Sequence, residues 1–168
     1  MIKIWPILIG CENLMNKFEL EHIYIQKRMR CLKIMGKNRN ELYLTNDELL
    51  FIKTAKMIEK DVERCDKNIP YFKNINNLNK LHHILLVHAN EHIEMGYIQG
   101  MSDLLAPILL IMQSEVNSYT CFEYLMKKMW PRFPYNEHQN IYNDLLIEII
   151  KVHKNILIRF WIMKCGKN

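Results

Sequence analysis

The chain has 168 residues, of which 49% are hydrophobic and 24% are charged, with five glycines and five prolines. This composition excludes disordered, collagen-like and linker-dominated chains, and the length suits one compact domain. The net charge of +5 does not indicate nucleic-acid binding, because the densest basic stretch, 27–39, lacks the interleaved aromatic side chains that stack on bases.

The cysteines and the hydropathy both indicate a reducing, aqueous compartment. Five cysteines are scattered along the chain and none lies in a C-x-x-C pair, which argues against a disulfide framework and against a thiolate zinc site. No signal peptide is recognisable, and the most apolar stretch, Leu104 to Met112, is far shorter than the about 20 residues that span a membrane. We therefore expect a cytoplasmic protein with no transmembrane segment.

Helical spacing of apolar residues dominates the chain, whereas the alternating pattern of strands is almost absent, so we predict an all-α, multi-helical fold. A first apolar segment, 5–10, precedes a polar and basic connecting segment, 11–46. The connecting segment contains one amphipathic helix, indicated by Leu20, Ile23 and Tyr24, and we expect its far end, 36–40, to be a loop.

A helix over about 47–66 comes next, and Asn46 or Asp47 is suited to cap its start. Its apolar residues recur at steps of three and four positions, which places them on one inward face. The predicted inward face consists of Leu50, Thr54, Met57, Ile58, Asp61, Val62 and Cys65. Arg64 lies beside this face, at its edge.

A loop over 68–77 and a helix over about 77–93 follow in the prediction. The inward face of this helix consists of Leu78, Leu81, Ile84, Leu85 and His88. Gly96 and Gly100 then predict a tight turn between two helices, because glycine adopts backbone angles that other residues avoid.

The next predicted helix, capped by Ser102 or Asp103, is apolar on all sides, so we expect it at the centre of the fold. Pro107 lacks a backbone donor and is expected to bend this helix. A helix over about 117–130 and a last amphipathic helix over about 138–163 complete the prediction.

His88 and His92 lie one helical turn apart, as zinc ligands can. Glu91, however, stands beside the second histidine and not beside the first, unlike the H-E-x-x-H motif of metalloproteases, and no third ligand is apparent. We therefore expect no metal site, and histidines that lie at the surface and at the edge of the core. Cys65 and Cys121 fall on apolar helix faces, where we expect buried, inert thiols.

Other catalytic motifs are missing as well. No serine lies in G-x-S-x-G, and no loop reads G-x-x-x-x-G-K-S/T, so neither an α/β-hydrolase nor a chain that binds nucleotide by itself is indicated.

Two short motifs carry the functional information. Residues 58–64 read I-x-x-D-x-x-R, and residues 96–101 read G-Y-I-Q-G-M. The residues of these motifs, with the acidic residue that follows them, are Ile58, Asp61, Arg64, Gly96, Tyr97, Gln99, Gly100, Met101 and Asp103. Together with the opening W-P-I-L-I-G at 5–10, they resemble the TBC-domain family of GTPase-activating proteins for Rab-type small GTPases. The stretches R-C-D, D-L-L-A-P-I-L and C-F-E-Y-L-M-K most resemble its small G-protein signalling modulator branch.

The resemblance implies that Arg64 is an arginine finger and Gln99 a glutamine finger, both supplied in trans to speed GTP hydrolysis by a Rab-like, or Rap-like, small GTPase. The chain then has no cofactor of its own, because GTP and Mg²⁺ are carried by the partner. Asp61, three residues before Arg64, is expected to aim the guanidinium, and Tyr97 to brace the loop by packing. The implied setting is the cytoplasm, at endomembrane surfaces, in vesicle trafficking.

The resemblance covers the N-terminal part of a TBC domain, 1–168, because the family's second helical lobe follows the segment that resembles 141–163. Without that lobe, apolar residues such as Ile149 and Phe160 are expected to be exposed. An alternative function is therefore a GTPase-binding adaptor, or truncated pseudo-activator, that does not accelerate hydrolysis. A weaker alternative, a basic RNA-binding helical protein, predicts RNA affinity that falls steeply with salt.

Overall fold

The computed structural model describes residues 17–37, 44–65 and 69–129. The chain divides into two units, Met1–Tyr124 and Leu125–Asn168, and the features discussed below lie in the first. All regular structure in the described residues is helical, which confirms the all-α prediction. The elements are α2 (Lys17–Lys37), α3 (Asn46–Glu63), the 3₁₀ helix η2 (Pro70–Lys73), α4 (Ile75–Glu91), α5 (Met101–Met112) and α6 (Glu115–Met129).

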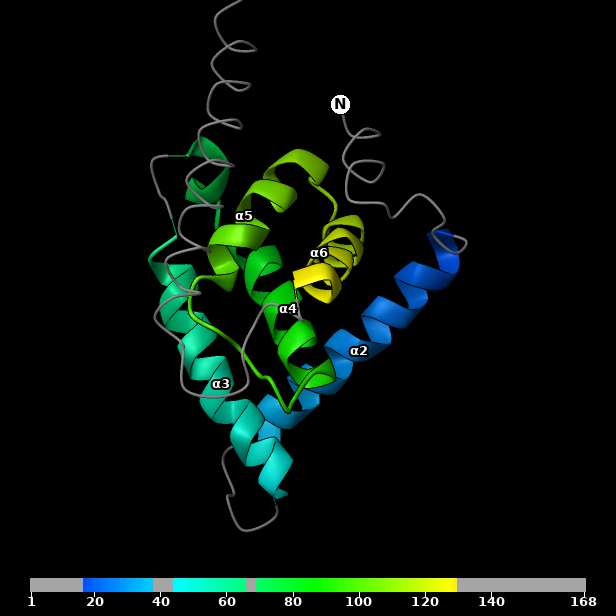
Figure 1. Cartoon of the computed structure of the whole chain (residues 1–168), viewed down its shortest axis with the longest axis vertical. Helices are drawn as coiled ribbons and strands as arrows, with labels where there is room; N and C mark the ends of the chain where they lie inside the picture. The colour runs from blue at the N-terminus through cyan, green and yellow to red at the C-terminus, as the bar shows by residue number, and fades with distance from the viewer. Residues whose placement is uncertain (1–16, 38–43, 66–68, 130–168) are drawn as a thin grey trace, which may run out of the picture. The chain divides into compact units, whose positions relative to one another are not determined.

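Helix α4 is the helix around which the first unit packs. It contacts α2, α3, α5 and η2, and Figure 1 shows it among them. Its buried residues lie mostly in its second half: Leu81, Ile84, Leu85, Leu86, Val87, His88 and Ala89. Each fully buried Leu or Ile stabilises the fold by about 1.5–3 kcal/mol relative to exposure. Helix α5, predicted to be central, is also buried on most of its surface, and it continues through Pro107 to Met112.

Helix α2 lies inside the stretch that was predicted to connect elements, and it confirms the amphipathic helix expected there. The helix continues through Gly36 to Lys37, which corrects the first two positions of the loop expected at 36–40, and positions 38–40 lie outside the described residues. Tyr24 and Cys31, two turns apart, are its buried residues. The Cys31 thiol donates to the Leu86 carbonyl of α4, which fixes how α2 packs against that helix.

Helix α3 begins earlier than predicted because Thr45 caps it. The Thr45 hydroxyl accepts from the Glu48 amide while the Glu48 carboxylate accepts from the Thr45 amide, which is a capping box. The inward face is also corrected: Leu50 and Met57 are exposed, whereas Phe51 and Ala55 are buried with Ile58 and Val62.

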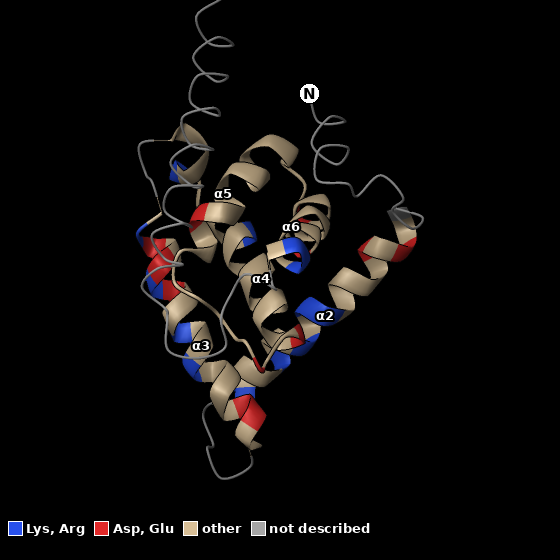
Figure 2. Cartoon of the chain, in the orientation of Figure 1, with Lys and Arg blue, Asp and Glu red and all other residues tan. Residues whose placement is uncertain are grey.

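The other boundaries differ by a few residues. Asn74 caps α4, which starts at Ile75 instead of Asn77, and Gly100 instead of Ser102 or Asp103 precedes α5. Among the residues that the structure describes, most charged ones lie on α2 and α3, while α4 and α5 are largely uncharged (Figure 2). None of the described helices is long and apolar enough to cross a membrane. The predicted segments 5–10 and 138–163 lie outside the described residues.

Candidate functional site

Arg64 terminates α3 and points into solvent. It is the C-cap residue of the helix, and 65% of its side chain is exposed. Its Nη2 atom donates to Oδ1 of Asp61, one turn earlier on the same face. Asp61 is only 9% exposed at its side chain, so a well-covered carboxylate holds one terminal nitrogen of the guanidinium while most of the Arg64 side chain stays exposed. Ile58, one turn further back, is buried.

Tyr97 connects the second motif to the same carboxylate. Its side chain is buried, and its hydroxyl donates to Oδ2 of Asp61 at 2.8 Å. Burial raises the pKa of the Tyr97 hydroxyl, Asp61 acts in the same direction and hydrogen bonding to Ser102 opposes it. The phenol therefore stays protonated and serves as a donor. The sequence predicted that Tyr97 would brace the loop by packing, and the structure adds this hydrogen bond.

The loop between α4 and α5 owes its shape to two glycines. Gly96 and Gly100 have φ angles of 61° and 97°, in the left-handed region that side chains disfavour. A Cβ at Gly96 would meet Thr54 Oγ1 at 3.7 Å, an ordinary contact, and one at Gly100 would meet nothing within 4 Å. The backbone angle, and not a lack of space, is therefore what these two positions require.

Gln99 is exposed on this loop, directly before Gly100. Its neighbours are fixed, because the buried Met101 side chain accepts from the Ile98 amide and the Met101 amide donates to the Ile98 carbonyl. Asp103 is exposed in the first turn of α5. Its negative charge interacts favourably there with the positive end of the helix dipole.

The two predicted finger residues thus project from a shared support. Asp61 accepts hydrogen bonds from α3 through Arg64 and from the loop through Tyr97. Gln99 follows Tyr97 by two residues, so their Cα atoms are within about 7 Å of each other. Arg64 and Gln99 are both exposed. The arrangement offers a permanent cation and a carboxamide to a partner.

A second polar cluster, which sequence reasoning missed, joins α4 to α6. His88 Nδ1 lies 2.6 Å from Glu123 Oε1, and His92 Nε2 lies 2.8 Å from Glu123 Oε2. Burial acts to raise the pKa of Glu123, but hydrogen bonds and charge from His88 and His92 outweigh it and hold the pKa below its ordinary value. The absence of a third ligand group was therefore a wrong expectation, and His88 is buried in the core.

The sequence carries only a weak signal for Glu123 as a partner of the two histidines. Glu123 follows Phe122 directly, beside the buried face of α6, where an acidic residue needs partners. Its partners are 31 and 35 positions away in the sequence, so only the packing of α6 identifies them. Cys65 and Cys121 are buried, as predicted.

Comparison with known proteins identifies the family of this chain. The family model of the Rab-GTPase-TBC domain matches residues 2–160. The chain is 49% identical over 90 residues to "Small G protein signaling modulator 1" of Homo sapiens, covering 52% of this chain and 8% of that protein. It is 49% identical over 77 residues to "Small G protein signaling modulator 2" of Mus musculus, covering 46% of this chain and 8% of that protein.

A third relative has a more specific name. The chain is 41% identical over 85 residues to "Rab GTPase-activating protein tbc-8" of Caenorhabditis elegans, covering 51% of this chain and 9% of that protein. The matched stretch therefore spans less than a tenth of the length of each of these three relatives.

Proposed function

We propose that this chain, which belongs to the Rab-GTPase-TBC domain family, stimulates GTP hydrolysis by a Rab-like small GTPase. Arg64 and Gln99 would act in trans on GTP and Mg²⁺ that the GTPase holds. The observation that carries the proposal is the Asp61 carboxylate, which accepts hydrogen bonds from both Arg64 and Tyr97. One support thereby serves an exposed guanidinium and the loop that bears Gln99.

Arg64 has the properties that an arginine finger needs. Hydrolysis of GTP is slow because negative charge develops on phosphate oxygens, and a guanidinium from a partner accelerates it by about 10³–10⁵-fold. The guanidinium is always charged and its planar fork matches phosphate oxygens. The bond to Asp61 restricts the side chain before binding, which reduces the entropy lost when it enters the GTPase.

Gln99 has the complementary role in this proposal. Its carboxamide both donates and accepts hydrogen bonds, so it can orient the attacking water against the γ-phosphate. The left-handed Gly96 and Gly100 on either side, together with the anchored Tyr97, hold the backbone from which this side chain projects.

The partner and the place of action belong to the same proposal. The name of the Caenorhabditis elegans relative supports a Rab-type GTPase, and the two modulator names refer more broadly to small G proteins, which extends the candidates to Rap-like GTPases. The GTPase would recruit the chain from the cytoplasm to endomembrane surfaces, in vesicle trafficking.

Single-turnover GTP hydrolysis by a panel of GTP-loaded Rab and Rap proteins tests this function. We expect the wild-type chain to stimulate at least one of them, and Arg64→Ala to lose about 10³-fold of the stimulation, equivalent to about 4 kcal/mol. Gln99→Ala should also be severe. Lys53→Ala is the matched control, because it removes an exposed positive charge from the same helix about 16 Å away along the axis.

The adaptor alternative makes a different prediction in the same assay. If the wild-type chain binds a GTP-loaded GTPase but leaves its hydrolysis rate unchanged, as do both variants, the chain is a binding module. Equal losses in Lys53→Ala and Arg64→Ala would show that general electrostatic attraction, and not the finger, is responsible.

A further inference from the structure

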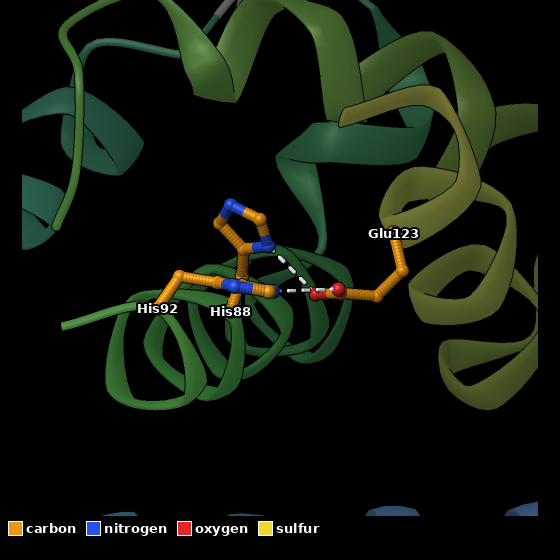
Figure 3. A group of neighbouring side chains, drawn as sticks. All are labelled: His88, His92 and Glu123. Carbon is orange, nitrogen blue, oxygen red and sulfur yellow. Dashed lines mark hydrogen bonds and ion pairs between the residues drawn. The ribbon is translucent and has the colours of Figure 1, made fainter. Parts of the chain in front are cut away.

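Two histidines and one carboxylate meet between α4 and α6. Figure 3 shows His88 and His92 projecting from α4, one turn apart, toward Glu123 on α6. One ligand atom from each residue lies within 4.8 Å of the other two. The cluster shares no residue with the finger site.

We propose that His88, His92 and Glu123 form a binding site for a divalent transition-metal ion, for which zinc is the best chemical match. Two imidazole nitrogens and one carboxylate oxygen are a donor set that zinc takes, with water at a fourth, tetrahedral position. Two histidines spaced i, i+4 on one helix, with an acidic third ligand from a neighbouring helix, bring these donors together.

The distances suit a small cation after a slight expansion. Zinc bonds of about 2.0–2.2 Å in a tetrahedron place neighbouring ligand atoms about 3.4 Å apart. The nitrogen–oxygen distances of 2.6 and 2.8 Å therefore need to open by roughly 0.6–0.8 Å, within the reach of small side-chain rotations. Binding would replace the two hydrogen bonds with three bonds to the ion, one from each ligand residue.

Neighbouring groups orient the ligands and leave a route for the ion. The ring of Phe122 packs edge-on against His88, with the ring centroids 5.0 Å apart, which helps to hold the buried imidazole in position. His88 is 1% exposed at its side chain and His92 is 36% exposed, so the ion can arrive from the His92 side and be gripped from the interior by His88.

The site is suited to hold structure and not to hydrolyse a substrate. Ala89 follows the first histidine, at the position where metalloproteases carry the glutamate that acts as general base. The His92 carbonyl accepts from the Met95 and Gly96 amides, at 3.0 and 2.8 Å. An ion on His92 would therefore pin the point at which the Gln99 loop leaves α4.

Titration of the metal-free full-length chain with Co²⁺, followed by Zn²⁺ competition, tests the site. We expect one equivalent of Co²⁺ to give the intense visible bands of a tetrahedral ion, with no thiolate-to-cobalt charge-transfer band. His92→Gln and Glu123→Gln should each weaken binding by at least about 100-fold, the upper end of what loss of an outer-shell partner costs. His22→Gln, an exposed histidine on α2, is the matched control and should bind as the wild type does.

Two measurements on the unmodified chain keep the test decisive if a variant fails to fold. Zinc should block carbethoxylation of His92 in the wild type, and it should slow hydrogen exchange at the Met95 and Gly96 amides. A charge-transfer band from cysteine, unchanged affinity in a folded His92→Gln, or a His92 that is labelled equally with and without zinc would overturn the proposal. None of these readouts depends on a GTPase.

Discussion

The first unit contains two clusters of the same composition, each an arginine and a tyrosine on one carboxylate. In the first, Asp61 accepts from Arg64 and Tyr97. In the second, Glu115 accepts from Arg28 and Tyr24 of α2, at 3.1 and 2.7 Å, and His83 of α4 lies 3.4 Å away. The chemistry is alike, but the exposure of the arginine is not.

Arg28 and Arg64 differ in the exposure of their side chains. The Arg28 side chain is 32% exposed, and its Nε atom is buried without a hydrogen-bond partner among the described residues. Its charge is used to tie α2 to the start of α6. Arg64 is 65% exposed, with one donor on Asp61. The two paired arginines therefore differ in how much of the side chain the fold leaves exposed to a partner.

The largest expected contrast comes from replacing each arginine by lysine. Lysine keeps the charge but loses the planar fork, so Arg64→Lys should reduce stimulated GTP hydrolysis by about 10²–10³-fold. Arg28→Lys should leave the stimulated rate within about 2-fold and lower the free energy of unfolding by about 1 kcal/mol, the value of one hydrogen bond. Single-turnover hydrolysis and urea unfolding measure the two effects. Equal losses of hydrolysis in the two folded variants would abolish the contrast.

The second contrast concerns acid stability, which should depend on Glu115. Burial acts to raise the pKa of Glu115, but the nearby His83 and the hydrogen bonds from Tyr24 and Arg28 outweigh it and hold the pKa below its ordinary value. A carboxyl whose pKa is lowered by folding stabilises the protein above the unfolded pKa, and this stability is lost as the pH falls through the folded pKa.

Glu115→Gln should therefore cost about 2 kcal/mol at pH 7, as expected for loss of hydrogen bonds to a charged group. The difference from wild type should shrink once the pH falls below about 4. Urea unfolding at several pH values measures it, with the exposed Glu19→Gln of α2 as control. A difference that grows on acidification would contradict the assignment.

The sequence predicts the local features of this fold, but not the contacts between distant segments. Helical periodicity predicted every described α-helix, and the spacing of Asp61 and Arg64 predicted their contact, because both signals are local. The cap at Thr45 was missed in favour of Asn46 or Asp47, although Glu48 completes a capping box with Thr45 three residues later. The bond between Tyr97 and Asp61 spans 36 positions, and no local pattern specifies a pairing at that separation. The exposure of Leu50 and Met57 likewise depends on which neighbours cover α3, which periodicity does not reveal.

The smallest effect we expect comes from the most specific change, the removal of one tyrosine hydroxyl from each cluster. Tyr97 and Tyr24 are both buried phenols that donate to a carboxylate, so Tyr97→Phe and Tyr24→Phe should each lower the free energy of unfolding by about 1 kcal/mol. Only Tyr97→Phe loosens the support of the fingers, so it alone should reduce stimulated hydrolysis, by about 10-fold, without weakening GTPase binding. Tyr71→Phe is the control, because the Tyr71 hydroxyl is buried without a hydrogen-bond partner among the described residues, so its removal should not lower the free energy of unfolding. If Tyr24→Phe slowed hydrolysis as much as Tyr97→Phe, the common cause would be global stability, and Asp61 would be one more fastening like Glu115.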